Sequence, residues 1–172
     1  YYAQEALRLS IKTNQPKIQA YSLADIGNYY KRSENYQLAL KYYKNSLSVR
    51  EKMNDFELII GGYNQIALLF KQQENYDSAA FYFETGLSML RRDPNPVLTL
   101  KLYDGYAMTL YHLGEAERAL AYLDSSYVLA EDVQDSAVIA NGLQRKGVIR
   151  QYLGQPSLAL KYYAEADAYF RE

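Results

Sequence analysis

Apolar positions in this chain recur with helical spacing, and the pattern as a whole recurs at a constant interval. Ala39 is followed by an aromatic residue four positions later and a small residue seven positions later, which places all three on one helix face. Equivalent alanines stand at 79, 119 and 159. The pattern predicts four copies of one amphipathic helix, and a period of about 40 residues is typical of stacked repeats. The four copies are residues 34–47, 74–87, 114–127 and 154–167.

A second amphipathic helix precedes each copy and has a small residue at its centre. Large or apolar residues mostly flank this small residue at offsets of −4, −1 and +3, which form one stripe. Glycine inside a helix costs about 1 kcal/mol relative to alanine, so we expect a neighbouring helix to pack closely there. Short breaks separate the two helices of each copy and predict antiparallel helical hairpins. The small residues are Gly27, Ala67, Ala107 and Gly147.

Asparagine, aspartate and proline mark the junctions between hairpins at 52–55, 92–96 and 133–136. Residues 1–13 match the second helix of a unit, so the array opens on half a repeat. The last repeat ends inside its second helix without the polar cap that solenoids usually need. Because an initiator methionine is also missing, we expect a segment of a longer protein. We predict a single array over 1–172: a half repeat with linker (1–19), then repeats at 20–59, 60–99, 100–139 and 140–172.

Composition narrows the function classes. Nineteen basic and twenty acidic residues give a net charge of −1, without the basic excess of nucleic-acid binders, so direct contact with nucleic acid is not expected. The absence of cysteine excludes disulfides and thiolate metal sites, and fits cytoplasm and periplasm equally. No apolar run approaches the length of a membrane span.

No arrangement of residues indicates catalysis. His112 is the single histidine, with no second histidine for a metal site and no nucleophile arranged around it. Gly61 and Gly62 do not continue into a phosphate-binding loop. We therefore expect no catalytic residue, no metal and no cofactor, and an enzyme ranks third among the alternatives. The tyrosine pairs at 29–30, 42–43 and 162–163 could form a stacking surface, but packing in the core is favoured.

The order of residue types resembles the tetratricopeptide repeat family, whose pattern is W-x-x-L-G-x-x-Y, A-x-x-x-F and a closing proline. Repeat four departs from it at Lys146 and Arg150, where apolar residues belong. The closing proline is absent and the unit is longer than the family's roughly 34 residues, so we expect the second helices to run further. Longer units are similar to those of bacterial regulatory members, including sensory regions joined to DNA-binding or kinase domains. Repeat one matches through Leu23, Ile26, Gly27, Tyr30, Ala39 and Tyr43.

The resemblance implies an all-α fold, a right-handed superhelical solenoid whose first helices line a concave groove. Side-chain amides there could pair with the backbone of an extended peptide, although solvated helix faces also carry amides. Four cations against Asp104 give this face an excess of three positive charges, which suggests an acidic ligand unless they are ordinary solvated charges. The predicted peptide-binding residues are Asn28, Lys31, Arg32, Asn64, Leu68, Lys71, Lys101, Met108, Tyr111, Asn141, Gln144 and Val148.

Binding of a chaperone's C-terminal tail is disfavoured. Of the family's five carboxylate-clamp positions, Asn28 and Lys101 match, whereas Ala24, Gln65 and Gly105 do not.

The predicted surface is compatible with two functions. The first is a protein- or peptide-binding scaffold, the sensory or docking segment of a larger bacterial transcriptional regulator or signalling kinase. The alternative is a structural module that forms homo-oligomers, possible homodimers included, through its last repeat. The residues expected at that interface are Leu158, Leu160, Tyr162, Tyr169 and Phe170.

Overall fold

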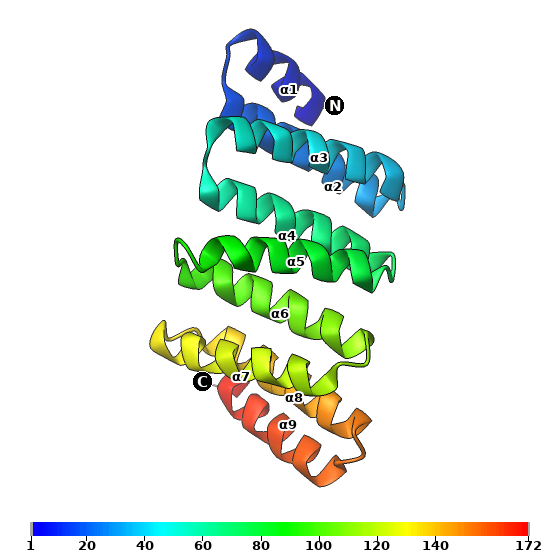
Figure 1. Cartoon of the computed structure of the whole chain (residues 1–172), viewed down its shortest axis with the longest axis vertical. Helices are drawn as coiled ribbons and strands as arrows, with labels where there is room; N and C mark the ends of the chain where they lie inside the picture. Colours follow the sequence, from blue (N-terminus) through cyan, green and yellow to red (C-terminus); the bar gives the residue numbers. More distant parts are fainter. Residues whose placement is uncertain (1, 172) are drawn as a thin grey trace. The chain divides into compact units, whose positions relative to one another are not determined.

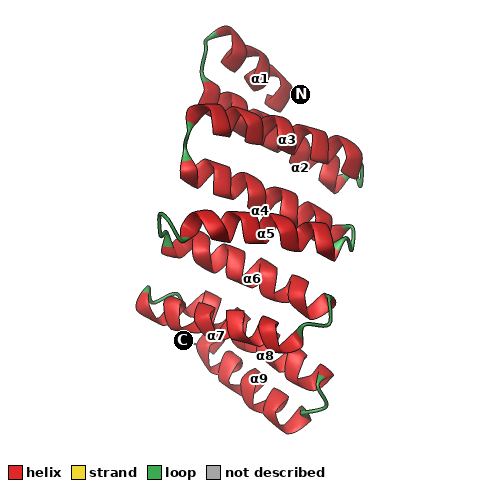
Figure 2. Ribbon diagram, viewed as in Figure 1, coloured by secondary structure: helices red, strands yellow, loops and turns green. Residues whose placement is uncertain are grey.

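The structure is a computed structural model that describes the backbone of residues 2–171 and the side chains of residues 2–169. Over these residues the chain is all-α: helices joined by short turns, with no strand (Figures 1 and 2). The predicted fold class is confirmed. The chain divides into two compact units, Tyr1–Met89 and Leu90–Glu172, and each is described by itself.

In the first unit, consecutive helices pack against one another as antiparallel hairpins (Figure 1). Its core contains Ala39, Tyr43 and Ile66, and the rings of Phe70 and Tyr82 stack beside it with centroids 5.6 Å apart. The helices are α1 (Tyr2–Lys12), α2 (Pro16–Arg32), α3 (Tyr36–Met53), α4 (Phe56–Gln72) and α5 (Tyr76–Leu90).

The second unit repeats this arrangement. Its core contains Leu100, Ala130, Ile139, Leu143 and Ala166, so each helix of the unit contributes to one cluster. The helices are α6 (Pro96–His112), α7 (Ala116–Asp132), α8 (Ser136–Tyr152) and α9 (Pro156–Arg171). The division into four repeats and a half repeat stays a prediction.

The close helix approach expected at the small residues is confirmed at both glycines. A Cβ placed on Gly27 would lie 2.6 Å from the Tyr43 ring, and one on Gly147 would lie 2.4 Å from the Tyr163 ring. The recurring alanine of the second helix is likewise buried in each hairpin, from Ala39 to Ala159. The small positions therefore exist because a side chain of the neighbouring helix occupies the space.

We expected the second helix of each repeat to run further because the closing proline is missing. This holds for α3 and α7 but not for α5. α3 continues past Glu51 to Met53, and α7 continues past Glu131 to Asp132. In contrast, α5 ends at Leu90, just before the sequence that contains Pro94 and Pro96. Proline disfavours helical geometry in the preceding residue and cannot donate the helical hydrogen bond, so the chain must leave the helix there.

Tight turns between helices use a left-handed residue. Glu34 and Glu74 have φ of 58°, and the glycines at the equivalent positions, Gly114 and Gly154, have φ of 82° and 72°. The next backbone N–H closes the turn, as when Asn35 donates to the carbonyl of Tyr30 at 2.9 Å. Capping residues then start the following helix. Side-chain oxygens of Asn35, Asp55, Asn75, Asn95 and Asp135 each accept from a backbone N–H three residues later.

Glycine should therefore stabilise the two turns that lack it. We expect Glu34→Gly and Glu74→Gly each to raise the free energy of unfolding by about 0.5–1 kcal/mol, because glycine has no Cβ penalty at positive φ. Urea unfolding followed by circular dichroism measures the change. The matched control is Gly114→Ala, which should lower the same quantity by about 1 kcal/mol. A loss of stability in the Glu34→Gly variant would contradict the expectation.

Candidate functional site

Residues of α6 and α8 form one face within the second unit. Asp104 on α6 is paired with Arg145 on α8, whose Nη2 donates to Oδ2 at 3.0 Å while Nε contacts Oδ1. Further along the same helices, the rings of Tyr111 and Tyr152 meet edge to face with centroids 5.3 Å apart. These two contacts place α6 and α8 side by side along one face of the second unit.

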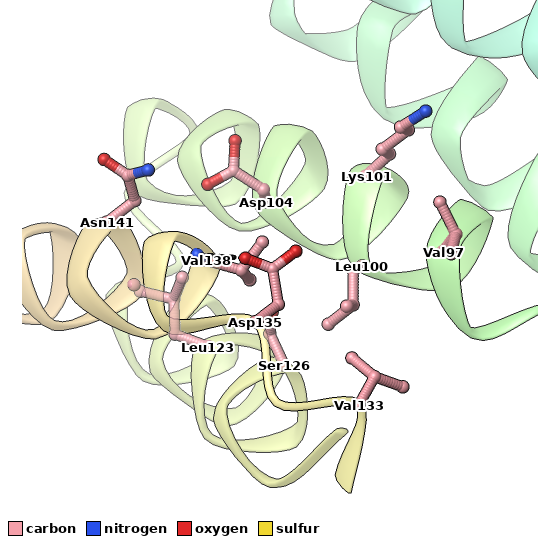
Figure 3. A pocket seen from close by; sticks show the side chains of 11 residues that line it. Val97, Leu100, Lys101, Asp104, Leu123, Ser126, Val133, Asp135, Val138 and Asn141 are labelled. Atoms are coloured by element: carbon pink, nitrogen blue, oxygen red, sulfur yellow. Dashed lines mark hydrogen bonds between the residues drawn. The ribbon is translucent and has the colours of Figure 1, made fainter. Parts of the chain in front are cut away.

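A cavity of about 230 Å³ opens on this face between α6, α7 and α8. It is lined by the predicted residues Lys101 and Asn141 and by two carboxylates, Asp104 and Asp135 (Figure 3). Gly142 leaves it open, because a Cβ at that position would meet nothing within 4 Å. The remaining lining residues are apolar or small: Val97, Leu100, Leu123, Ser126, Val133 and Val138.

The other predicted residues of this unit differ in exposure. Gln144 and Val148 on α8 are exposed, and Asn141 is exposed at the mouth of the cavity. Met108 and Tyr111 on α6 are half-buried. The amides of Asn141 and Gln144 can therefore meet a peptide backbone in solution, whereas Met108 and Tyr111 offer only part of their side chains.

In the first unit, the predicted amides of α2 and α4 are partly engaged by the fold. The Tyr43 hydroxyl donates to Oδ1 of Asn28 at 2.7 Å, which leaves the amide nitrogen of Asn28 to donate outward. Burial raises the pKa of Tyr43 to about 12, so this hydroxyl stays a donor at neutral pH. Oδ1 of Asn64 is buried and has no donor within the described part of the chain.

The cations of the first unit's face lie at its surface. Arg32 is exposed, and Lys31, Leu68 and Lys71 are half-buried on α2 and α4. No acidic residue stands among the predicted residues of these two helices, so their three cations give an excess of three positive charges. In the second unit Asp104 is paired with Arg145, so the single predicted cation, Lys101, adds one further positive charge. Most of the positive charge of the predicted face thus belongs to α2 and α4.

Two charged site residues were absent from the sequence-based set. Arg145 was missed because it lies between the predicted groove positions Gln144 and Val148. It follows its partner Asp104 by 41 residues, which is one repeat and one further position. Asp135 was assigned only to turn chemistry, yet it both caps α8 and lines the cavity. The repeat period could have revealed the pairing of Asp104 with Arg145, but not the cavity.

The two cations that break the repeat pattern in α8 have acidic partners on α7. Lys146 is buried, and its Nζ lies 2.7 Å from Oδ1 of Asp124 and 4.9 Å from the centroid of the Tyr127 ring. Arg150 lies 3.8 Å from Glu117 and donates to the side-chain oxygen of Gln155. These two side chains are therefore part of the packing of the second unit, not of its binding face.

Most of the apolar residues expected to support self-association are engaged within the unit. A hydrogen bond between the hydroxyls of Tyr127 and Tyr169, together with burial, raises the pKa of Tyr127, and the ring of Tyr162 lies 5.8 Å from Nζ of Lys146. Leu158 is half-buried, whereas Leu160 is 67% exposed. Phe170 lies outside the residues whose side chains are described. Self-association stays a prediction.

The described residues also bear on membrane spans and metal sites. No helix among them combines the length and apolar character needed to cross a bilayer. Within the same residues, no group of three or more histidine, aspartate or glutamate side chains is arranged to hold a metal ion.

Comparison with known protein families identifies the repeat. Residues 19–55 and residues 60–89 each match a family model described as tetratricopeptide repeat. The chain contains tetratricopeptide repeats. This fold is a protein-interaction scaffold rather than an enzyme family. The comparison with curated proteins gives no significant match.

Solved structures with the same fold include bacterial proteins. BtubC from P. vanneervenii aligns with a TM-score of 0.85 and 16% identity, over 98% of this chain and 70% of that chain. PlcR from Bacillus thuringiensis, in complex with the peptide PapR7 and DNA, has a TM-score of 0.79 and 16% identity, over 99% of this chain and 64% of PlcR. A Rap protein complexed with Competence and Sporulation Factor has a TM-score of 0.77 and 20% identity, over 90% of this chain and 43% of the Rap protein.

These identities establish a shared fold only. The chain spans less than half of the Rap protein and about two thirds of PlcR and BtubC. The peptides bound by PlcR and Rap are therefore properties of those two proteins.

Proposed function

We propose that this tetratricopeptide repeat protein binds a protein or peptide through the faces of its first helices, and that it serves as the sensory or docking segment of a larger bacterial regulator. The observation that carries the proposal is the shared face of α6 and α8, where exposed amides adjoin an open cavity. Amides that both donate and accept suit the backbone of an extended chain. Two proteins of the same fold were solved with PapR7 and with Competence and Sporulation Factor, which supports this direction.

Charge favours an acidic segment at the first unit. Lys31, Arg32 and Lys71 carry three positive charges on the predicted face of α2 and α4, while the whole chain has a net charge of −1. A local excess of one sign attracts ligands of the opposite sign and raises their association rate. An acidic peptide segment bound to α2 and α4 is therefore the ligand that we propose for this unit.

The test is selection of peptides from a random library against the full chain, followed by affinity measurement with charge-reversal variants. Lys31→Glu with Lys71→Glu should weaken the selected acidic peptides by about tenfold or more, with a steep dependence on salt. The matched control is Lys41→Glu with Lys44→Glu, two exposed lysines on α3, which should leave affinity within about twofold.

Equal effects of the two double variants would contradict the proposal that α2 and α4 hold the ligand. Failure to select any peptide would contradict peptide binding itself. Light scattering on the same samples separates the alternative, because a stable dimer that Leu160→Glu dissociates would instead favour self-association through the exposed Leu160.

A further inference from the structure

At the position in the first unit that corresponds to the cavity of the second unit, the structure has the side chain of Arg50. Arg50 on α3 is 3% exposed, and its Nη1 donates to the carbonyl oxygen of Leu58 on α4 at 2.8 Å. The same nitrogen lies 3.5 Å from where a Cβ would stand on Gly61 or Gly62. Burial lowers the pKa of Arg50, and the nearby Tyr21 and Asp55 oppose that effect electrostatically.

The neighbours of Arg50 correspond one by one to lining residues of the cavity. Counting forward by two repeats leads from α2, α3 and α4 to α6, α7 and α8. At the position of Arg50 itself the second unit has Ala130, which has no side chain long enough to reach the same place. The neighbours Tyr21, Asp55, Leu58, Gly61 and Gly62 become Lys101, Asp135, Val138, Asn141 and Gly142, all of which line the cavity.

Space and charge at this place both favour a guanidinium. A Cβ on Gly62 would meet Leu47 at 2.9 Å and Arg50 at 3.5 Å, whereas a Cβ on Gly142 would meet nothing within 4 Å. Asp135 keeps the carboxylate that Asp55 provides, and Asn141 adds an amide where Gly61 has no side chain. Burying a guanidinium requires such charged and hydrogen-bonding partners.

The remaining charges of the lining do not cancel Asp135. Asp104 is neutralised by its pair with Arg145. Lys101 is exposed, and in Figure 3 its ammonium extends away from Asp104 and Asp135. Asp135 is thus the lining carboxylate that remains for a bound cation.

We propose that the cavity between α6, α7 and α8 binds the side chain of an arginine from a partner polypeptide, with Asp135 as the charged acceptor and the Val138 carbonyl and the Asn141 side chain as further acceptors. The proposal rests on the proposed function, because it names an anchor residue of the bound polypeptide. The first unit has Arg50 of its own chain at the corresponding place, hydrogen-bonded to the Leu58 carbonyl and near the carboxylate of Asp55.

The probe is Nα-acetyl-arginine N-methylamide, titrated into the full chain labelled with ¹⁵N and followed by NMR. Amide signals of Val138, Asn141 and Gly142 should shift and saturate. Signals of Leu58 and Gly62 should not move, because Arg50 already occupies the corresponding place. The corresponding citrulline amide, which has the same shape without the charge, should shift none of them.

Two variants test the assigned contacts. Asp135→Asn removes the charge but retains an N-cap oxygen for α8, and it should weaken the probe by about tenfold. Asp55→Asn, the matched change in the first unit, should leave the affinity unchanged. Gly142→Leu fills the cavity in a helix that tolerates leucine and should abolish the shifts.

Several results would overturn the proposal: no shift at Gly142, an equal response to the citrulline amide, or an equal loss of affinity in the Asp55→Asn variant. The probe needs no peptide partner, so the two proposals can fail separately. Selected peptides that bind while the probe leaves Gly142 unmoved would remove the arginine site alone. Saturable probe binding without any selected peptide would instead remove the proposed function.

Discussion

Replacing Gly27 by alanine is expected to lower the free energy of unfolding by about 2 kcal/mol, although alanine is the better helix former. The added Cβ would lie 2.6 Å from Cδ1 and Cε1 of the Tyr43 ring. That ring cannot move aside cheaply, because Tyr43 is 2% exposed and its hydroxyl is bonded to Asn28. Overpacking of a close-packed core typically costs about 1–3 kcal/mol, which exceeds the gain of about 1 kcal/mol in helix propensity.

Another hairpin of the chain indicates which second substitution should make room for alanine at position 27. Ala107 and Leu123 hold the equivalent positions in the third hairpin, and both are buried. In a Tyr43→Leu background, Gly27→Ala should therefore raise stability, by about 1 kcal/mol. Chemical unfolding of the four variants of this cycle measures the coupling.

Two further glycines calibrate this prediction. Gly147→Ala should cost less, about 1 kcal/mol, because the half-buried Tyr163 can turn toward solvent. Gly142→Ala meets no atom and should stabilise α8 by about 1 kcal/mol. If Gly27→Ala stabilised the wild-type chain as Gly142→Ala does, the assigned helix contact would be wrong.

Removing Asp124 is expected to lower the free energy of unfolding by about 2–3 kcal/mol. Its carboxylate lies 2.7 Å from Nζ of Lys146, whose side chain is only 7% exposed. Loss of one partner of a buried pair leaves an uncompensated charge and costs about 3–5 kcal/mol. The cost here should lie below this range, since Asp124 itself is 68% exposed and water can reach that side.

The compensating change is Lys146→Ile, which places in α8 the residue that Ile26 and Ile66 provide in α2 and α4. With Lys146→Ile present, Asp124→Ala should cost less than about 0.5 kcal/mol. Urea unfolding at neutral pH measures all four combinations, and Glu5→Ala, which breaks the exposed pair with Arg8, is the surface control. Equal costs of Asp124→Ala in both backgrounds would show that Lys146 does not depend on this carboxylate.

The hairpin architecture could be predicted from local chemistry. The constant repeat interval, the amphipathic stripes, and Asn or Asp at the helix starts can all be read along the chain, and local signals of this kind determine helices and turns. The small residues also indicated where a helix would approach, since Gly27 has no other reason to stand inside α2. The length of α5 could have been predicted as well, because Pro94 and Pro96 follow it directly.

Details of the candidate surface were decided by contacts between helices. Sequence offsets placed Lys101 and Asn141 on one face, but the pairing of Asp104 with Arg145 and the burial of Lys146 beside Asp124 depend on which side chains meet across α6, α7 and α8. Such meetings follow from packing distances that a repeat pattern does not specify.

The cavity shows most clearly which features the sequence determines and which depend on the tertiary structure. By itself, the sequence determined that Arg50 and Ala130 hold equivalent places in an all-α array of hairpins. Only the tertiary structure decided what this difference means, because the Arg50 side chain reaches across to the next helix while Ala130 cannot. The space in the second unit remains open because none of the described side chains of that unit fills it.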